Sequence, residues 1–319
     1  MESSKASEIV RWAYRLFLDR EPENEAVVEE KVKACPSTLE LRRTFMYSEE
    51  FRSKNAVSPT MSGHEPPISI DFSVSDIELE KLFAHIQSSW TSLGLNDPYF
   101  SVLTQGEFEK DSMSNKRIDE FYESGKKEVG RMSKTLDRNS VDHSSFQKCL
   151  DFGCGAGRIS RWISSEFKTI YAYDVSKNYL EMARKYLESK KISNVQFRQV
   201  TSVDDLRDFP KVDLIYSVIV LQHNPPPVIH CVITEFLKAL NPGGVAFFQV
   251  PTYKDGYRFH LKKYLRKESS QDAMEMHVLP QDAIFEIVRK ENGKILEVLE
   301  DFNTSWGLSN TFLVQKRES

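Results

Sequence analysis

A ten-residue stretch, CLDFGCGAGR from Cys149 to Arg158, constrains the fold more than any other part of the sequence. It joins a short apolar run to an amphipathic segment through three glycines at alternate positions. Glycines in such a loop let the chain turn sharply after a strand and bring backbone N–H groups close to a ligand at the start of the next helix. A dinucleotide-binding loop, G-x-G-x-x-G, would need its third glycine at position 158, which is arginine here. The stretch therefore predicts a ligand-binding strand–loop–helix unit with a different glycine spacing.

The chain from this loop onward alternates between short apolar runs and amphipathic segments. The runs are KCLDF, TIYAYD, VQFRQV, VDLIYSVIV and GVAFFQV, and helices are expected at 158–167, 177–190, 228–240 and 281–291. Strands that alternate with helices predict an α/β fold with a doubly wound, mainly parallel sheet. Two further runs, KILEVLED and NTFLVQK, lie close together near the end of the sequence, and a hairpin there makes the last strand antiparallel. We expect a seven-stranded sheet preceded by a helical N-terminal region.

The sequence before the loop indicates helical segments separated by a linker. SEIVRWAYRLFLDREP places Ile9, Trp12, Ala13, Leu16 and Phe17 on one apolar stripe, and STLELRRTFMYSEEFRS opens with the Ser–Glu spacing of a capping box. NAVSPTMSGHEPPIS has the Pro, Ser and Gly content of a linker. The expected divisions are a helical module at 1–55, a linker at 56–75, a helical cover packing on the core at 76–145, and the main α/β domain at 146–319.

Composition and charge narrow the classes of partner and compartment. With 43 basic and 47 acidic residues the formal net charge is −4, so bulk charge does not favour binding to nucleic acid. The four cysteines show no C-x-x-C or C-x-x-H spacing, which favours a reduced, cytoplasmic protein without structural zinc. The N-terminal segment lacks the apolar run of a signal peptide, and the apolar runs are too short to span a bilayer. We expect a cytoplasmic protein with no nucleic-acid partner and no membrane span.

The glycine loop and the segments after it resemble the class I S-adenosylmethionine (SAM)-dependent methyltransferases over about residues 146–319. Asp151 and the three glycines form the D-x-G-x-G-x-G spacing of that family's first motif, Asp174 ends the second strand, and LNPGGVAFFQV resembles the segment before the fifth strand. The resemblance implies a Rossmann-like fold with SAM as methyl donor and S-adenosylhomocysteine (SAH) as product. It places the ribose at Asp174, the adenine near Ser202 and Val203, and the donor carboxylate near Tyr122. The full set of expected donor-binding residues is Asp151, Gly153, Cys154, Gly155, Gly157, Arg158, Asp174, Val175, Ser202, Val203, Ser217, Gln222 and Tyr122.

The stretch LQHNPPPVIH, residues 221–230, contains an Asn-Pro-Pro string that also begins a motif of enzymes that methylate nitrogen. In those enzymes an aromatic residue follows the prolines and stacks on the base or amide, whereas Pro227 stands here. The string also comes later than 217–220, the segment that matches the end of the fourth strand. It therefore predicts a helix start, with Asn224 as the N-cap and Pro225 in the first turn.

Methyl transfer is an in-line displacement at the sulfonium methyl, and an aliphatic hydroxyl acceptor also needs a base to take its proton. His223 should lie at the carboxyl end of the central sheet, where doubly wound folds bind ligands, and is the first candidate for that base. His277 is the second. A histidine at 223 that only braces the donor loop fits the sequence equally well. No acidic cluster with metal-ligand spacing accompanies the fourth strand, so no metal is expected.

Residues 252–280 form a connection long enough to be a lid and are rich in aromatic and basic side chains. Tyr253, Arg258 and His260 are candidates for binding a phosphorylated or nucleotide-linked acceptor. A solvated amphipathic helix would show the same pattern.

The pattern YRLFLDREP…FMYSEEFR resembles a phycobilisome-linker-like module found fused to bacterial enzymes of glycan synthesis. That module usually has glycine where Asp19 stands and near Glu25. These resemblances favour O-methylation of a small-molecule, glycan or nucleotide-sugar hydroxyl, with oligomer formation through the N-terminal helices as an option. N-methylation of a protein or small molecule, and an inactive SAM-binding scaffold, are the alternatives.

Overall fold

The computed structural model describes residues 3–46, 48, 50–51, 61, 64–72, 74–96, 98–99, 102, 114–266, 274–301, 303 and 307–318. The chain divides into two compact units, residues 1–64 and residues 65–319, each with its own core. The expected linker (56–75), cover (76–145) and lid (252–280) are each described in part, and their positions that fall in the gaps between these ranges lie outside the described residues.

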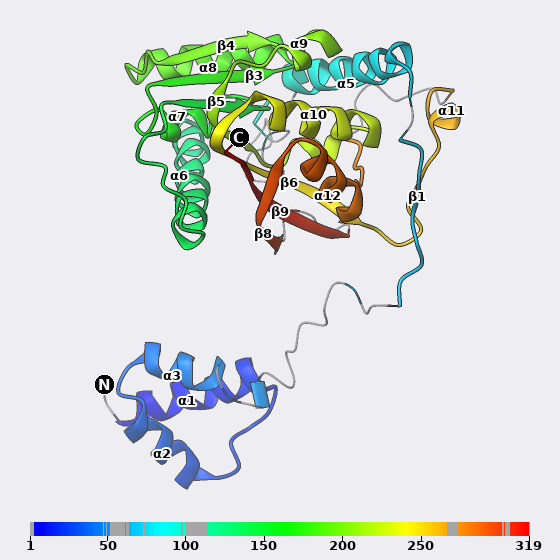
Figure 1. Ribbon diagram of the computed structural model, residues 1–319. Coiled ribbons are helices and arrows are strands. Elements are labelled where there is room, and N and C mark those ends of the chain that lie inside the picture. The colour runs from blue at the N-terminus through cyan, green and yellow to red at the C-terminus, as the bar shows by residue number, and fades with distance from the viewer. Residues whose placement is uncertain are drawn as a thin grey trace. The chain divides into compact units, whose positions relative to one another are not determined.

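The described part of unit 1 consists of helices α1 (Ser3–Leu18), α2 (Glu25–Ala34) and α3 (Thr38–Met46) (Figure 1). The side chain of Asn24 caps α2 by accepting a hydrogen bond from the backbone N–H of Val27 at 3.1 Å. Before α3, the Glu40 N–H donates to Ser37 Oγ at 3.2 Å and the Ser37 hydroxyl donates to the Glu40 carboxylate at 3.0 Å, which gives the N-cap half of the expected capping box. Local capping therefore fixes where two of the helices begin.

The apolar stripe of α1 differs from the prediction at two positions. Trp12 and Leu16 are 50% and 75% exposed, whereas Val10, Tyr14 and Leu18 are buried. The predicted stripe and the observed stripe both have the spacing of a helix face, and a small rotation about the helix axis would bury one in place of the other. The packing partners decide between them, since Tyr14 meets Phe45 of α3 edge-on with ring centroids 4.9 Å apart. The prediction is wrong for Trp12 and Leu16.

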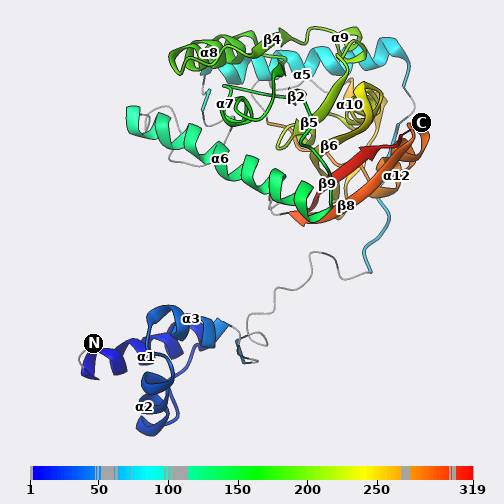
Figure 2. The same cartoon turned by 60° about the vertical axis from the view of Figure 1, so that its left-hand side comes forward.

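Unit 2 is built on a seven-stranded sheet with the strand order β4-β3-β2-β5-β6-β9-β8 (Figures 1 and 2). Its strands are β2 (Lys148–Phe152), β3 (Thr169–Asp174), β4 (Val195–Gln199), β5 (Val212–Ser217), β6 (Leu240–Tyr253), β8 (Gly293–Asp301) and β9 (Leu308–Lys316). β9 runs antiparallel to β6 and β8, and the neighbouring pairs from β4 to β6 are parallel. The predicted α/β fold, with a mainly parallel sheet and an antiparallel last strand, is confirmed.

Helices cover both faces of this sheet (Figure 2). One face packs against α6 (Asn115–Arg138), α7 (Ser160–Ile163) and α8 (Lys177–Ser189). The other packs against α5 (Asp76–Asn96), α9 (Val203–Arg207), α10 (Pro226–Ala239) and α12 (Gln281–Lys290). Successive strand residues point to opposite faces, so Cys149 of β2 joins the first core and Leu150 joins the second.

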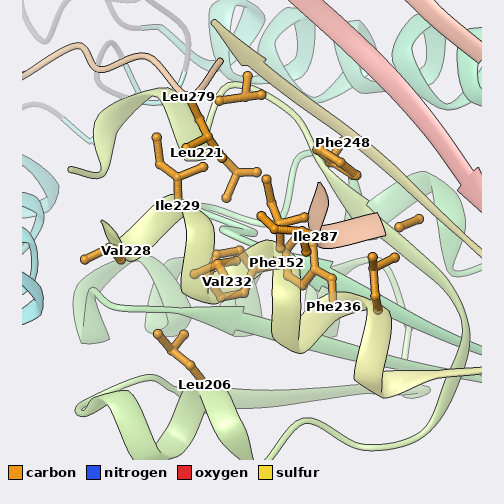
Figure 3. Packing of buried hydrophobic residues seen from close by; sticks show 14 of the residues in the cluster. Phe152, Leu206, Leu221, Val228, Ile229, Val232, Phe236, Phe248, Leu279 and Ile287 are labelled. Carbon is orange, nitrogen blue, oxygen red and sulfur yellow. The ribbon is translucent and has the colours of Figure 1, made fainter. Parts of the chain in front are cut away.

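The second core centres on α10 (Figure 3). Val232 and Phe236 of this helix lie against Phe152 of β2, and the Phe236 and Phe152 ring centroids are 5.2 Å apart. Phe248 of β6 and Ile287 of α12 complete the same cluster, and all five side chains are buried. This packing joins the carboxyl end of β2 to β6 through α10.

The start of α10 differs from the prediction. The helix begins at Pro226 with Pro225 in the N-cap position, while Asn224 ends the short 3-10 turn η3 (Leu221–His223). The Asn224 side-chain amide turns back and donates to the Val220 carbonyl at 2.8 Å. A capping side chain would have little to bind, because Pro226 and Pro227 carry no backbone N–H. Asn224 as the N-cap is therefore wrong, although the Asn-Pro-Pro string does begin a helix.

A strap from the start of unit 2 lies beside the segment after β6. β1 (Ser69–Ile70) pairs in parallel with β7 (Arg258–Phe259), ahead of the single-turn helix α11 (Leu261–Tyr264). Asp71 extends the strap, since its carboxylate accepts the Leu261 N–H at 3.0 Å. Across the described ranges, no helix is long and apolar enough to cross a membrane.

The order of the strands reverses next to β2, which lies between β3 on one side and β5 on the other. The connections from β2 to β3 and from β5 to β6 therefore proceed toward opposite edges of the sheet. Open α/β sheets bind ligands in the crevice that this reversal leaves at the carboxyl ends of the strands.

Candidate active site

A cavity lies at the reversal point of the sheet. It is bounded by the loop after β2, by the ends of β3, β4 and β5, and by Phe83, Ile86 and Trp90 of α5. Of the predicted donor-binding residues, those lining it are Asp151, Gly153, Cys154, Gly155, Arg158, Asp174 and Val175. The cavity thus brings together residues from the first two strand ends of the domain.

The loop after β2 requires glycine for two separate reasons. Gly153, Gly155 and Gly157 have φ angles of +73°, +52° and +82°, a region that other residues rarely adopt. Space is also limited, because a Cβ atom on Gly153 would lie 2.4 Å from both Cγ atoms of Val220. The absence of side chains therefore keeps the cavity open and the loop tight.

Two buried carboxylates stand behind this loop. Asp151 Oδ2 accepts the Ser160 hydroxyl at 2.5 Å. Asp174 accepts the backbone N–H groups of Gly155 and Ser176, each at 2.9 Å. Burial raises the pKa of each carboxyl group to about 6, and the hydrogen bonds from Ser160 and from these N–H groups oppose the rise. Asp174 therefore ties the end of β3 to the glycine loop and borders the cavity.

Unpaired polar atoms lie at the inner end of the cavity. Arg158 donates through one Nη to Ser124 Oγ at 3.2 Å, but its Nε is buried without a partner among the described residues. The Tyr216 hydroxyl is likewise buried and unpaired within the described ranges. Both side chains line the cavity. Buried polar groups almost always have partners, so these two atoms point to a bound polar group at this end.

The other predicted donor-binding residues do not line this cavity: Gly157, Ser202, Val203, Ser217, Gln222 and Tyr122. The Tyr122 hydroxyl donates to the Ala156 carbonyl at 3.0 Å, which braces the glycine loop from behind. Ser202 caps α9 by accepting the Asp205 N–H at 3.3 Å. Ser217 Oγ is buried and has no hydrogen-bond partner in the described part of the chain.

Residues 149–244 match the family model described as a methyltransferase domain. The magnesium protoporphyrin IX methyltransferase of Synechocystis PCC 6803, solved with bound SAH, has a similar structure, with a TM-score of 0.51 and 16% sequence identity. That similarity covers 73% of this chain and 98% of the other. The fold is that of the SAM-dependent methyltransferases.

Curated relatives match a shorter part of the chain. The ubiquinone biosynthesis O-methyltransferase of Actinobacillus pleuropneumoniae serotype 5b (strain L20) is 33% identical over 107 residues. The protein with the same description in Pseudomonas savastanoi pv. phaseolicola (strain 1448A / Race 6) is 30% identical over 103 residues. Each match covers 32% of this chain, and the chain spans 44% and 43% of the two relatives.

His223 belongs to a directed chain of hydrogen bonds. The Ile219 N–H donates to Gln249 Oε1 at 2.9 Å, so the Gln249 amide must donate through Nε2 to Gln222 Oε1, at 3.1 Å. Gln222 Nε2 then donates to His223 Nε2 at 3.1 Å, and His223 Nδ1 donates to the Glu275 carbonyl at 2.9 Å. Both ring nitrogens are thereby used, and burial lowers the pKa of His223 to about 4. The imidazole is neutral, and its lone pair is committed to Gln222.

His277 has a different environment. Its Nε2 lies 3.2 Å from Glu275 Oε2, and its Nδ1 lies 2.9 Å from the Tyr257 hydroxyl. The hydrogen bonds from His277 and then from Tyr264 hold the pKa of Glu275 at about 2, although its partial burial opposes the shift. An ionised Glu275 accepts the Nε2–H of the ring, which leaves the Nδ1 lone pair facing Tyr257. This Tyr257–His277–Glu275 group can move a proton toward the carboxylate.

The predicted acceptor-binding residues lie on the strap side of the domain. The Tyr253 hydroxyl donates to the Pro66 carbonyl at 2.8 Å. Arg258 and His260 are exposed, and His260 Nδ1 lies 3.7 Å from an Asp71 carboxylate oxygen. None of the three lines the cavity at the reversal point of the sheet. Within the described ranges, no group of three or more His, Cys, Asp or Glu side chains is placed to hold a metal ion.

Several residues that line the cavity or hold His223 in place were not predicted from the sequence. Gln249 and Glu275 fix His223 from 26 and 52 residues away in sequence, and no local pattern indicates such contacts. Ile219 lines the cavity with φ +61°, an unusual angle for a β-branched residue, and the hydrogen bond to Gln249 holds it there. Trp90 belongs to the predicted cover, but its contact with the His223 ring, 5.0 Å between centroids, depends on tertiary packing.

Proposed function

We propose that the protein transfers the methyl group of SAM to a hydroxyl oxygen of a small-molecule or glycan-like acceptor. The observation that carries this proposal is the cavity at the carboxyl ends of β2 and β3, with its glycine loop and its buried Asp174. The residues present there fit SAM along its length. Asp174 suits the ribose hydroxyls, and Val175, Phe83 and Val200 offer an apolar slot for the adenine.

The inner end of the cavity suits the amino-acid part of the donor. Arg158 Nε and the Tyr216 hydroxyl have no partners among the described residues and face the same cavity. A carboxylate would satisfy both donors with charge-assisted hydrogen bonds. The glycines next to them carry no side chains, so the donor can approach the backbone closely.

When bound, SAM would supply a methyl group that an acceptor oxygen attacks in line with the S–CH3 bond, so that SAH leaves as the thioether. The chain must align that oxygen and take its proton. We assign the proton to the Tyr257–His277–Glu275 group: the Tyr257 oxygen receives it while the Tyr257 hydroxyl proton passes to His277 Nδ1. Glu275 stabilises the imidazolium that forms. His223 is the weaker candidate, because Gln222 already occupies its Nε2 lone pair.

Two resemblances favour oxygen as the acceptor atom. The curated relatives are described as ubiquinone biosynthesis O-methyltransferases. The N-terminal sequence pattern resembles a module fused to enzymes of glycan synthesis. Phenolic hydroxyls and sugar hydroxyls are therefore the first acceptors to test.

The test uses SAM labelled in its methyl group with two sets of acceptors, catechol-type or quinol-type phenols and nucleotide-sugars or glycan ends. Label in an ether of either set supports the proposal. Label found on amines, or only on protein or RNA, contradicts O-methylation. His277→Gln is the variant expected to lose turnover, with Glu286→Gln, which alters an exposed carboxylate on α12, as the matched control.

A further inference from the structure

Helix α1 of unit 1 has a row of exposed side chains on the side away from its core. Trp12 and Leu16 are 50% and 75% exposed, whereas Val10, Tyr14 and Leu18 are buried. At 3.6 residues per turn, the exposed positions fall within about 100° of arc. We name this row the outer row of α1, and it consists of Lys5, Glu8, Trp12, Arg15, Leu16 and Asp19.

Trp12 stands at the centre of the outer row. The Arg15 guanidinium lies over the indole ring, 5.1 Å from its centroid, and Leu16 is one helical turn further along. Exposed tryptophan and arginine side chains contribute much of the binding energy where proteins meet. Single exposed apolar side chains are also common on surfaces that bind nothing, so the charges around Trp12 must identify the partner.

The charges of the outer row alternate in sign on both sides of Trp12. Glu8 and then Lys5 precede it, and Arg15 and then Asp19 follow it. Asp19 continues the last turn, because its N–H donates to the Arg15 carbonyl at 3.2 Å. If a second copy of α1 lies antiparallel to the first about a two-fold axis at Trp12, Lys5 meets Asp19 of the second copy. Glu8 then meets Arg15 of the second copy.

A parallel pair of outer rows would place each charge beside its own copy, and like charges repel. The outer row is therefore complementary to itself in the antiparallel direction, which is the condition for a two-fold interface. We propose that two copies of the chain form a homodimer through antiparallel outer rows, with Trp12 at the two-fold axis. The row is only about 21 Å long, so the dimer is reversible. Only residues of unit 1 enter this proposal, and the proposed function does not depend on it.

Sedimentation equilibrium of the full chain tests for this dimer, at concentrations from about 1 to 200 µM. We expect the mean mass to rise from that of one chain towards that of two. Trp12→Ala weakens the association about 100-fold or more, because the two-fold axis removes the tryptophan from both partners at once. The mass of a single chain at every concentration, or an unchanged association in Trp12→Ala, overturns the proposal.

A charge swap tests the antiparallel direction. Glu8→Arg places two arginines together at both of the Glu8–Arg15 contacts and weakens the association about tenfold. Adding Arg15→Glu brings opposite charges together again and restores the association to within about threefold of the wild type. Glu29→Arg, which reverses an exposed charge on α2, is the matched control and leaves the association unchanged. If the double variant associates as weakly as Glu8→Arg, Glu8 does not face Arg15 and the proposal is overturned.

Discussion

The two sides of the central crevice treat their polar groups differently. Within the cavity at the ends of β2 and β3, Arg158 Nε and the Tyr216 hydroxyl are buried without partners among the described residues. Beyond the end of β5, Gln249, Gln222 and His223 are linked in a hydrogen-bonded chain that begins at a backbone N–H and ends at a backbone carbonyl. Unpaired groups mark where a ligand is still needed, and a closed chain marks a structural brace.

The largest effect that sharpens this comparison concerns His277. We expect His277→Gln to lower kcat by about 100-fold or more, because glutamine cannot take the acceptor's proton. SAH affinity should stay within about twofold, since His277 does not line the donor cavity. Steady-state kinetics with the acceptor found by labelling checks the first statement, and calorimetry checks the second. Turnover close to that of the wild type would remove His277 from the proton path.

The next effect concerns the glycine loop. Gly153→Ala forces alanine into φ +73° and places its Cβ 2.4 Å from Val220. Strain and overpacking should lower the free energy of unfolding by about 2–4 kcal/mol and displace the loop, weakening SAH binding by about 30-fold or more. Gly130→Ala is the control, because a Cβ there meets nothing within 4 Å. An SAH affinity equal to that of the wild type would show that the loop does not contact the donor.

A smaller effect comes from the charge of Asp174. Its carboxyl pKa is about 6 in the free protein, raised by burial, and the ribose hydroxyls require the ionised form. SAH affinity should therefore fall as the pH drops below about 6, while the ligand's own α-amino and α-carboxyl groups titrate outside this window. Asp174→Asn should bind SAH about tenfold more weakly at pH 7.5 and show a smaller fall in affinity below pH 6, because only Asp151, whose pKa is also about 6, then titrates in the cavity. Titrations from pH 5 to 8 test this, and an Asp174→Asn variant with the full pH dependence of the wild type would contradict it.

The smallest effect is expected at His223. His223→Gln breaks the chain between Gln222 and the Glu275 carbonyl, and should cost about 1–3 kcal/mol of the free energy of unfolding. Once stability is accounted for, kcat should change little. Chemical denaturation and kinetics on the same variant measure both quantities. A loss of kcat equal to that of His277→Gln would restore His223 as the base.

How much of the structure the sequence predicts depends on whether the contacts join residues that are near or distant in the sequence. The strand–helix alternation and the glycine spacing are local patterns, and they predicted the sheet and the loop. The side chain of Tyr122 stacks on Tyr186 and binds the Ala156 carbonyl, contacts that depend on how α6 docks. The partners of His223 depend on the return of the chain after β6. Long-range packing of this kind leaves no periodic trace in the sequence.

The same reasoning explains the errors at helix α1 and at Asn224. Trp12 and Leu16 lie on a face with correct helical spacing, but α2 and α3 cover the neighbouring face. Asn224 has the identity of a good N-cap, yet Pro226 and Pro227, the residues that its side chain would cap, have no N–H. In both cases the local pattern was correct, but the structure lacks the packing surface or the backbone N–H that the predicted residue would contact.

The binding of SAH to the intact protein, measured by calorimetry at pH 7.5, tests the central claim most directly. We predict saturable binding of one SAH per chain, weakened by Gly153→Ala and by Asp174→Asn and unchanged by Gly130→Ala. Absence of SAH binding, or binding that ignores both of these substitutions, would contradict the assignment of the cavity at β2 and β3 as the donor site.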